Sequence, residues 1–106
     1  GARVGIRRLL LARPLVPRPG HERLVDALAR QGERVFGERI PVTATPLYTD
    51  ARLYGEAGVP AVLYGAGPRT ILEANAKRAD ENLLQDDLRR ATKVVAATLA
   101  ELLAPD

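Results

Sequence analysis

The sequence predicts an α/β fold, in which part of a three-layer sheet is flanked by helices. Residues 3–12 open with the polar and apolar alternation of a half-buried strand. Residues 60–64 form an uninterrupted apolar run, as in a strand buried on both faces of a parallel sheet. Residues 21–36 and 86–103 instead repeat apolar side chains at helical spacing. A helix followed by a buried strand is typical of an α/β layer.

A connector rich in proline follows the first predicted strand. It contains Pro14, Pro17, Pro19 and Gly20. This density disfavours both a helix and ladder pairing, because proline lacks a backbone N–H and has a fixed φ. The connector is therefore the best hinge candidate in the chain.

The next segment, residues 21–36, predicts an amphipathic helix. Leu24, Ala27, Leu28 and Val35 recur on one face, while charged side chains occupy the others. Gly32 weakens this helix by about 1 kcal/mol relative to alanine. Gly37 suits its C-terminal cap.

The middle of the chain predicts short elements around a glycine loop. Residues 40–47 form an extended segment, and Thr49 or Asp50 caps a brief helix that ends at Gly58. The loop Gly65-Ala66-Gly67 follows the apolar run 60–64. Open α/β sheets place their ligands at the carboxyl ends of such strands, so the loop is a candidate ligand site.

The last predicted helix covers residues 86–103. Its apolar stripe consists of Leu88, Ala91, Val95, Leu99 and Leu102. Asp86 and Asp87 lie in its first turn, where the helix dipole favours negative charge. We therefore interpret this acidic pair as part of the helix start and not as acid and base groups.

Composition excludes several classes of protein. The 106 residues suit one domain, and 46% apolar and 27% charged residues predict a packed core. No apolar run approaches the ~20 residues that span a bilayer, so we expect a soluble, cytoplasmic protein without membrane partners. The net charge of +3 is spread evenly and lacks stacking aromatics, which argues against nucleic acid. The chain contains no cysteine and no methionine, and we interpret it as a piece of a longer protein.

The sequence offers few candidate catalytic residues. His21 is the sole histidine, and it has no second ligand at metal-binding spacing. The Gly65-Ala66-Gly67 turn lacks the lysine of a phosphate-binding loop and the third glycine of a dinucleotide fingerprint. From the residues alone, we predict no catalytic residue in this chain.

An ordered set of short motifs nevertheless carries a family resemblance. The chain has Thr-Asp-Ala-Arg from Thr49, then Gly-Val-Pro-Ala-Val-Leu-Tyr-Gly-Ala-Gly-Pro over residues 58–68, Asn-Ala-Lys-Arg-Ala-Asp-Glu over 75–81 and Asp-Asp-Leu over 86–88. This order resembles the C-terminal part of the zinc-dependent metallopeptidases that include aminoacylase, acetylornithine deacetylase and succinyl-diaminopimelate desuccinylase. The resemblance implies a zinc-peptidase-like catalytic domain. Residues 1–16 would be the last strand of a lid or dimerisation domain plus the hinge, and residues 17–106 the C-terminal part of the catalytic domain.

The resemblance also implies a chemistry. Such enzymes hydrolyse amide bonds of acyl-amino acids or small peptides with zinc or cobalt, and their His-x-Asp motif, Asp and Glu-Glu pair lie upstream of the matching region. We therefore expect no cofactor in this chain alone and no activity from it. A homodimer is compatible with the lid-domain assignment.

One family ligand position falls inside this chain, four residues before Glu81, and it holds Lys77 in place of histidine. A protonated ammonium has no lone pair and repels a dication, so Lys77 is a poor zinc ligand. Two accounts stay open: Lys77 stabilises charge or anchors a substrate carboxylate, or the position has lost its metal and Lys77 lies on the surface.

The resemblance further implies a set of substrate-binding residues: Asp50, Arg52, Gly65, Ala66 and Gly67. An arginine and backbone N–H groups would bind a carboxylate there. In the alternative interpretation, these residues have no role in substrate binding: Asp50 is a helix cap and Arg52 is a surface residue. A different class of function also stays open, a non-catalytic binding or oligomerisation module whose leading strand pairs with a partner's edge.

Overall fold

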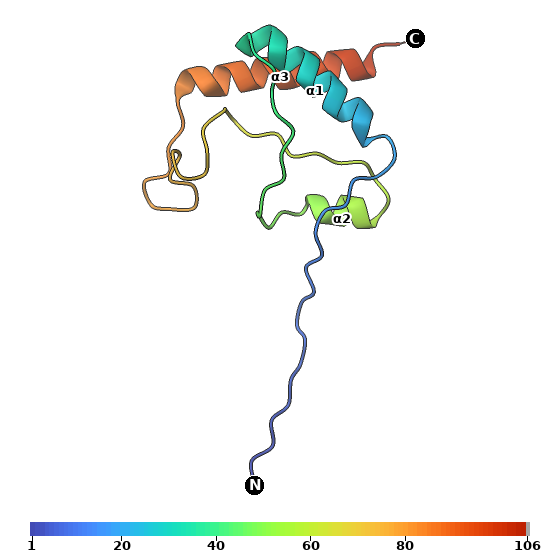
Figure 1. Ribbon diagram of the computed structural model, residues 1–106, viewed down its shortest axis with the longest axis vertical. Helices are drawn as coiled ribbons and strands as arrows, with labels where there is room; N and C mark the ends of the chain where they lie inside the picture. The colour runs from blue at the N-terminus through green and yellow to red at the C-terminus, as the bar shows by residue number, and fades with distance from the viewer. Residues whose placement is uncertain (106) are drawn as a thin grey trace.

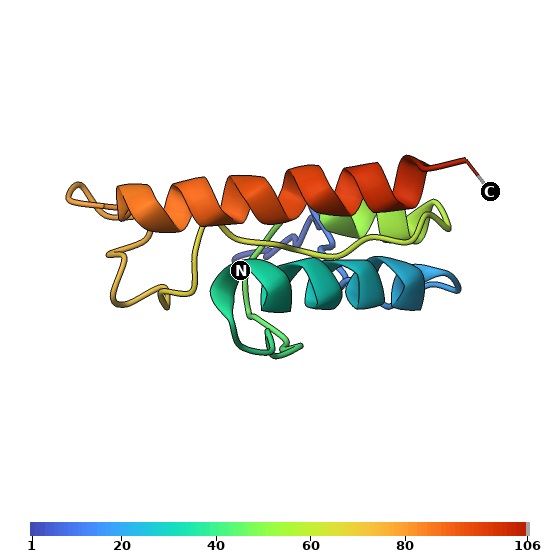
Figure 2. The same cartoon turned by 90° about the horizontal axis from the view of Figure 1, so that it is seen from above.

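The computed structural model describes residues 1–105, and its regular elements are three helices joined by irregular segments (Figure 1). They are α1 (His21–Phe36), α2 (Ala51–Glu56) and α3 (Gln85–Leu103). α1 and α3 pack side by side and antiparallel, as Figures 1 and 2 both show. The short α2 lies apart from this pair, across the extended segments. The positions predicted for all three helices are confirmed.

The predicted α/β sheet is wrong, because no strand forms within residues 1–105. A strand exists only as a member of a hydrogen-bonded ladder. The backbones of residues 3–12, 40–47 and 60–64 make no hydrogen bond to other backbone groups of the described chain. The half-buried strand predicted at 3–12 and the doubly buried strand predicted at 60–64 are therefore both wrong, and Val4, Ile6 and Leu63 are 89%, 95% and 48% exposed.

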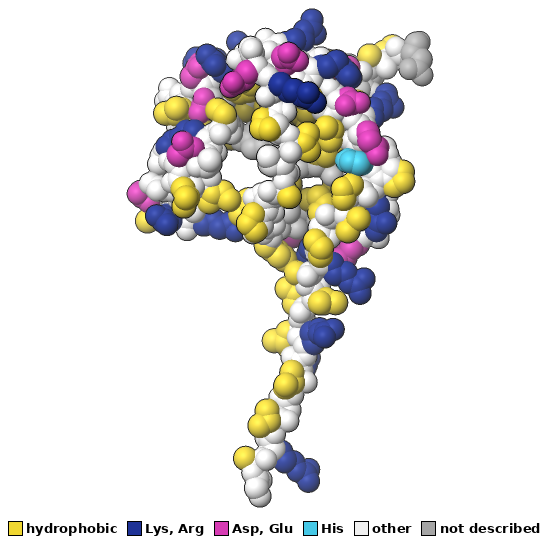
Figure 3. Space-filling model, in the orientation of Figure 1, with side chains coloured by type: hydrophobic (Ala, Val, Ile, Leu, Met, Phe, Trp, Pro, Cys, Tyr) yellow, Lys and Arg dark blue, Asp and Glu magenta, His cyan; other side chains and the backbone are white. Residues whose placement is uncertain are grey.

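The N-terminal segment, residues 1–12, is exposed throughout and extends away from the rest of the molecule as a tail (Figure 1). Val4, Ile6 and Leu9 are 89%, 95% and 83% exposed. The tail lengthens the molecule to 67 Å and raises its radius of gyration to 17.8 Å, against about 13 Å for a compact chain of this size. Hydrophobic and basic side chains line the tail in Figure 3.

Glycines flank α1 and follow α2. Gly20 and Gly37 flank α1 with φ of 96° and 78°, and the Gly37 N–H donates to the Glu33 carbonyl at 2.9 Å. This is the predicted left-handed C-cap, a conformation that strains any side chain with a Cβ. Gly58 has φ 81° and follows α2, as predicted. Leu15 and Arg18 fix the connector to α2, where the Arg18 Nε donates to the Gly55 carbonyl at 2.7 Å.

The core lies between α1 and α3 and consists of small side chains. Ala27 and Val94 are fully buried, and Ala91 is 4% exposed. The predicted stripe on α3 is only partly right. Ala91 is buried, but Leu88, Val95 and Leu99 stay 47%, 41% and 52% exposed. The packed face of α3 turns instead toward Val94, because small residues let two helices approach closely.

Gly32 serves the packing of α1. A Cβ at this position would lie 2.0 Å from Ile40 Cδ1, so Ile40 packs directly on the helix backbone. Glycine lowers the helix propensity at this position. It also leaves room for Ile40, which holds the segment after α1 against the helix.

A polar contact joins the two helices beside this core. Gln31 is 8% exposed, and its Nε2 donates to Glu101 Oε2 at 2.7 Å. Arg30 forms an ion pair with Oε1 of the same carboxylate. The hydrogen bond from Arg30, followed by that from Gln31, lowers the pKa of Glu101 below its ordinary value of 4.5. The charged form of Glu101 is thus favoured in the folded state.

We expect this contact to make the stability of the helix pair depend on pH. A lowered pKa contributes stability that is complete above the unfolded pKa of Glu101 and is lost as pH falls through the folded pKa. Urea unfolding of the wild type and Glu101→Gln should therefore differ most at about pH 7 and least at about pH 3. An equal difference at both values would contradict the assignment.

Candidate functional site

The Gly65-Ala66-Gly67 loop lies against the start of α3. A Cβ on Gly67 would meet the Asp87 Cβ at 2.7 Å, whereas one on Gly65 would have only the Gly67 carbonyl oxygen nearby, at 3.8 Å. Close approach thus requires glycine at 67 but not at 65. Asp87 Oδ2 is buried without a hydrogen-bond partner in the described structure. Asp87 therefore helps to seat the loop, a role that its place in the first helical turn did not reveal.

This loop lines a cavity of about 310 Å³. The cavity lies between the segment that leaves α1 and the segment that ends in the glycine loop. Its wall consists of Phe36, Glu38, Arg39, Ile40, Pro41, Thr43, Leu63, Tyr64, Gly65, Gly67 and Pro68. Figure 3 shows the surface hollowed on this side, below the helix pair. Such a volume is at the lower end of small-molecule sites.

The wall of the cavity combines an apolar surface with two charges. Ile40, Leu63 and Pro68 supply apolar contact, and burial raises the pKa of the Tyr64 hydroxyl. Glu38 and Arg39 are exposed and carry opposite charges. Neither forms an ion pair with any residue that the structure describes. The lining is thus apolar at Ile40, Leu63 and Pro68 and charged at Glu38 and Arg39.

Arg52 lies elsewhere, on α2, and is engaged by its neighbours. Its Nη2 donates to the Tyr48 hydroxyl at 3.0 Å, and its Nη1 lies 3.4 Å from Glu56 Oε1. The guanidinium also stacks 5.3 Å from the Tyr48 ring centroid. The hydrogen bond that Arg52 donates to the Tyr48 hydroxyl is the main cause that raises the pKa of Arg52. Arg52 is only 9% exposed, so the expectation that it is a surface residue is wrong.

Asp50 is exposed beside α2 and makes no side-chain cap to that helix. Thr49 takes this role, because its Oγ1 accepts from the Ala51 N–H at 3.3 Å. Neither Asp50 nor Arg52 lines the cavity. The predicted substrate-binding residues thus fall into two groups, with Gly65 and Gly67 at the cavity and Asp50 and Arg52 on the α2 side. Ala66 lies exposed between the two glycines. The role of these five predicted residues in substrate binding stays a prediction.

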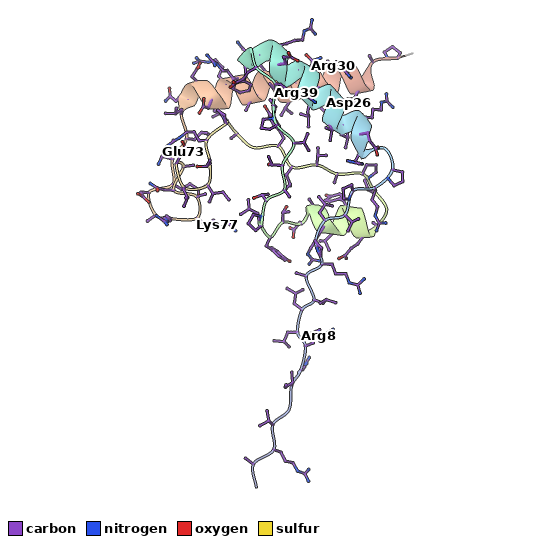
Figure 4. All side chains as sticks on the ribbon, viewed as in Figure 1. Arg8, Asp26, Arg30, Arg39, Glu73 and Lys77 are labelled. Carbon is purple, nitrogen blue, oxygen red and sulfur yellow. The ribbon has the colours of Figure 1, made fainter. Side chains whose placement is uncertain are left out.

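Lys77 lies in a loop that side chains hold together. Figure 4 shows Lys77 and Glu73 in this loop, away from the helix pair. Arg69 donates to Asn82 Oδ1 at 2.6 Å and closes the loop, while the Glu73 carboxylate accepts from the Thr70 N–H at 2.7 Å. This bond from Thr70 is the first cause that lowers the pKa of Glu73.

The residues at the family's ligand position do not fit a metal. Lys77 is exposed with φ 65°, and its backbone N–H donates to Glu81 Oε2 at 3.0 Å, so this carboxylate is already engaged. Within residues 1–105, no three His, Cys, Asp or Glu side chains gather as a metal site.

His21 has a local role at the start of α1. Its Nδ1 lies 3.0 Å from the Arg18 carbonyl oxygen and 3.2 Å from Glu22 Oε1. These contacts tie the helix start to the connector. They provide no second nitrogen or sulfur ligand.

Sequence reasoning missed Glu38, Arg39 and Tyr64 as candidate site residues. They belong to segments more than twenty positions apart, and only the fold brings them to one cavity. The one signal in the sequence is the adjacent pair of opposite charges directly after the cap Gly37.

Comparisons with known proteins give one match. The family model of peptidase family M20/M25/M40 matches residues 3–101. No curated protein and no solved structure matches the chain. Among the described residues, no helix is long and apolar enough to cross a membrane.

Proposed function

We propose, since this chain belongs to peptidase family M20/M25/M40, that it supplies the C-terminal part of a metal-dependent hydrolase that cleaves amide bonds of acyl-amino acids or small peptides. The observation that carries this proposal is the family match over residues 3–101. The order of the motifs from Thr49 to Leu88 supports the aminoacylase and deacetylase branch of the family. Members of the family are generally metal-dependent, which is consistent with zinc or cobalt.

In this proposal, residues 1–16 belong to a lid or dimerisation domain and include the hinge, and residues 17–106 belong to the catalytic domain. The exposed tail and the proline-rich connector support this division. The metal-binding and catalytic residues come from a region outside these 106 positions, and the chain alone is inactive. Its own contribution is part of the substrate cleft, through the glycine loop at the cavity and Arg52 on α2.

A hydrolysis assay tests this function. With added zinc or cobalt, we expect no turnover of N-acetyl-L-methionine by the chain alone. We expect metal-dependent turnover when the chain is joined to a region that carries the His-x-Asp motif and the Glu-Glu pair. In that joined protein, Lys77→His should raise the zinc content measured by elemental analysis. Chelator-sensitive turnover by the isolated chain would contradict the proposed inactivity, and an inactive joined protein would contradict the hydrolase function.

The exposed apolar tail favours a second candidate, a non-catalytic oligomerisation module. Val4, Ile6 and Leu9 present apolar side chains on a backbone that has no partner in the described chain. Such a segment can pair with the edge of another molecule. Size-exclusion chromatography with light scattering should then detect a dimer that truncation of residues 1–12 abolishes. A monomer at high concentration would count against this module.

A further inference from the structure

We propose that Arg13 and Arg18 form a binding site for a phosphate group where the tail joins the helical body. The two arginines line a second cavity, of about 240 Å³, between the connector and α2. The rest of its wall consists of Pro14, Val16, Gly55 and Glu56. This cavity shares no residue with the one beside the glycine loop. The inference goes beyond the proposed function, which assigns no ligand to the connector.

The charge around this second cavity favours an anion. Glu56 is the acidic residue of the wall, and its carboxylate lies 3.4 Å from the Arg52 guanidinium, which offsets its charge. Neither Arg13 nor Arg18 forms an ion pair within residues 1–105. Residues 1–20 contain five arginines and no acidic residue, although the net charge of the chain is only +3. Figure 3 shows basic side chains at this junction. An anion would therefore meet two arginines that have no ionic partner in the described chain.

Contacts with α2 hold Arg18 in place. Its Nε donates to the Gly55 carbonyl at 2.7 Å, and this bond leaves the two terminal nitrogens of the guanidinium for a ligand. Gly55 also lies directly against the connector, since a Cβ there would be 2.7 Å from Leu15 Cδ1 and 3.7 Å from the Val16 carbonyl oxygen. The connector is thus fixed to α2 on both sides of the cavity wall, and Arg18 is oriented before any ligand binds.

The two guanidinium groups match a phosphate group better than a single carboxylate. Guanidinium binds either anion through charge-assisted, often bidentate hydrogen bonds. A carboxylate has one charge and two oxygens, whereas a phosphate monoester has about 1.5 to 2 negative charges at pH 7 and three acceptor oxygens. The volume of about 240 Å³ is below the roughly 300 Å³ at which small-molecule sites begin. It suits a phosphate group with a short carbon chain against Pro14 and Val16.

A bound phosphate group restrains the tail. Arg13 directly follows the tail, whereas Arg18 is fixed to α2. A ligand held by both spans Pro14 and Pro17 and fixes the direction in which the tail leaves the body at this point in Figure 1. In the proposed function the same stretch includes the hinge of a lid domain, so a regulatory effect on the lid rests on that function. The binding site itself does not.

An NMR titration of the full chain at constant ionic strength tests the site. The probes are inorganic phosphate, methyl phosphate, acetate and succinate. We expect both phosphates to shift the amide signal of Gly55 but not those of Gly65 and Gly67, and to bind more tightly than acetate and succinate. Tighter binding of methyl phosphate assigns a phosphomonoester to the site, and tighter binding of inorganic phosphate assigns the free ion.

Four variants separate the site from general charge. Arg13→Gln and Arg18→Gln should each weaken phosphate about tenfold. Arg18→Gln also removes the hydrogen bond to Gly55, so Arg13→Gln is the decisive change. The matched controls are Arg8→Gln in the tail and Arg23→Gln on α1, which remove the same charge at exposed positions outside the cavity wall. They should bind phosphate like the wild type.

Spin labels measure the restraint on the tail. The chain has no cysteine of its own, so Val4→Cys and Ala96→Cys place one label on the tail and one on an exposed position of α3. Phosphate should narrow the distribution of distances between the labels, and Arg13→Gln should abolish this narrowing. An unchanged distribution at saturating phosphate would refute the restraint and leave the binding site in place.

Three results would overturn the binding site: no saturable shift at Gly55, an Arg8→Gln variant that loses as much affinity as Arg13→Gln, or succinate that binds more tightly than both phosphates. None of these results bears on the hydrolase function. In the same way, an inactive joined protein would refute the hydrolase and leave the phosphate site standing.

Discussion

Replacement of Ala27 by leucine is expected to lower the free energy of unfolding by about 1–3 kcal/mol, because it inserts extra methylene and methyl groups into a closely packed contact. Ala27 has no exposed surface and lies where α1 meets α3. The contact is made of small side chains, including Ala91 and Val94. There is therefore little room to rearrange, and the helices must separate to accept leucine.

Urea unfolding followed by circular dichroism measures this effect. The matched control is Ala96→Leu, the same change on an exposed position of α3. We expect the control to change stability by less than about 0.5 kcal/mol. Equal effects of the two changes would mean that the face through Ala27 is not what holds α1 to α3.

The second large effect is expected from Gly67→Ala. Its new Cβ would lie 2.7 Å from the Asp87 Cβ, an atom fixed to the backbone of α3. Neither atom can rotate away, so the loop must leave the helix or the helix start must shift. We expect a loss of about 1–3 kcal/mol and altered amide shifts at the start of α3.

Gly65→Ala is the control for this change, since its Cβ would meet only the Gly67 carbonyl oxygen at an ordinary 3.8 Å. This variant should keep the wild-type shifts at Asp87. If Gly65→Ala disturbed α3 as strongly as Gly67→Ala, loop flexibility and not close packing would explain both results.

The helices could be predicted from the sequence because the hydrogen bonds of a helix join residues four positions apart. Gly37 marks the end of α1, and its positive φ and its bond to Glu33 match the sequence pattern. The strands could not be predicted in the same way. The run 60–64 has the composition of a buried strand, but pairing depends on a second segment that no local pattern supplies.

The prediction of the face of α3 that packs against α1 was partly wrong for a different reason. This helix carries apolar residues around much of its circumference, so periodicity alone left several stripes to choose from. Although α3 carries larger apolar side chains, such as Leu99, the two helices meet at the smaller Ala91 and Val94. The depth of contact depends on the partner helix, here on Ala27.

One part of the candidate site could be predicted from the sequence, and another part could not. The glycine loop could be found because glycines after an apolar run mark a turn, and this loop does line the cavity. Glu38 and Arg39 could not be found, since adjacent charges after a helix usually belong to a solvated linker. Their significance depends on a loop more than twenty positions away.

The exposed tail has a practical consequence for the sites at which trypsin can cut. Unpaired, solvated backbone is where proteases act first, and the tail offers arginine at positions 3, 7 and 8. The next arginines, Arg13 and Arg18, are each followed by proline, and trypsin cleaves such bonds poorly. Digestion should therefore trim the chain to Leu9 and then pause, leaving the connector attached to the helical body.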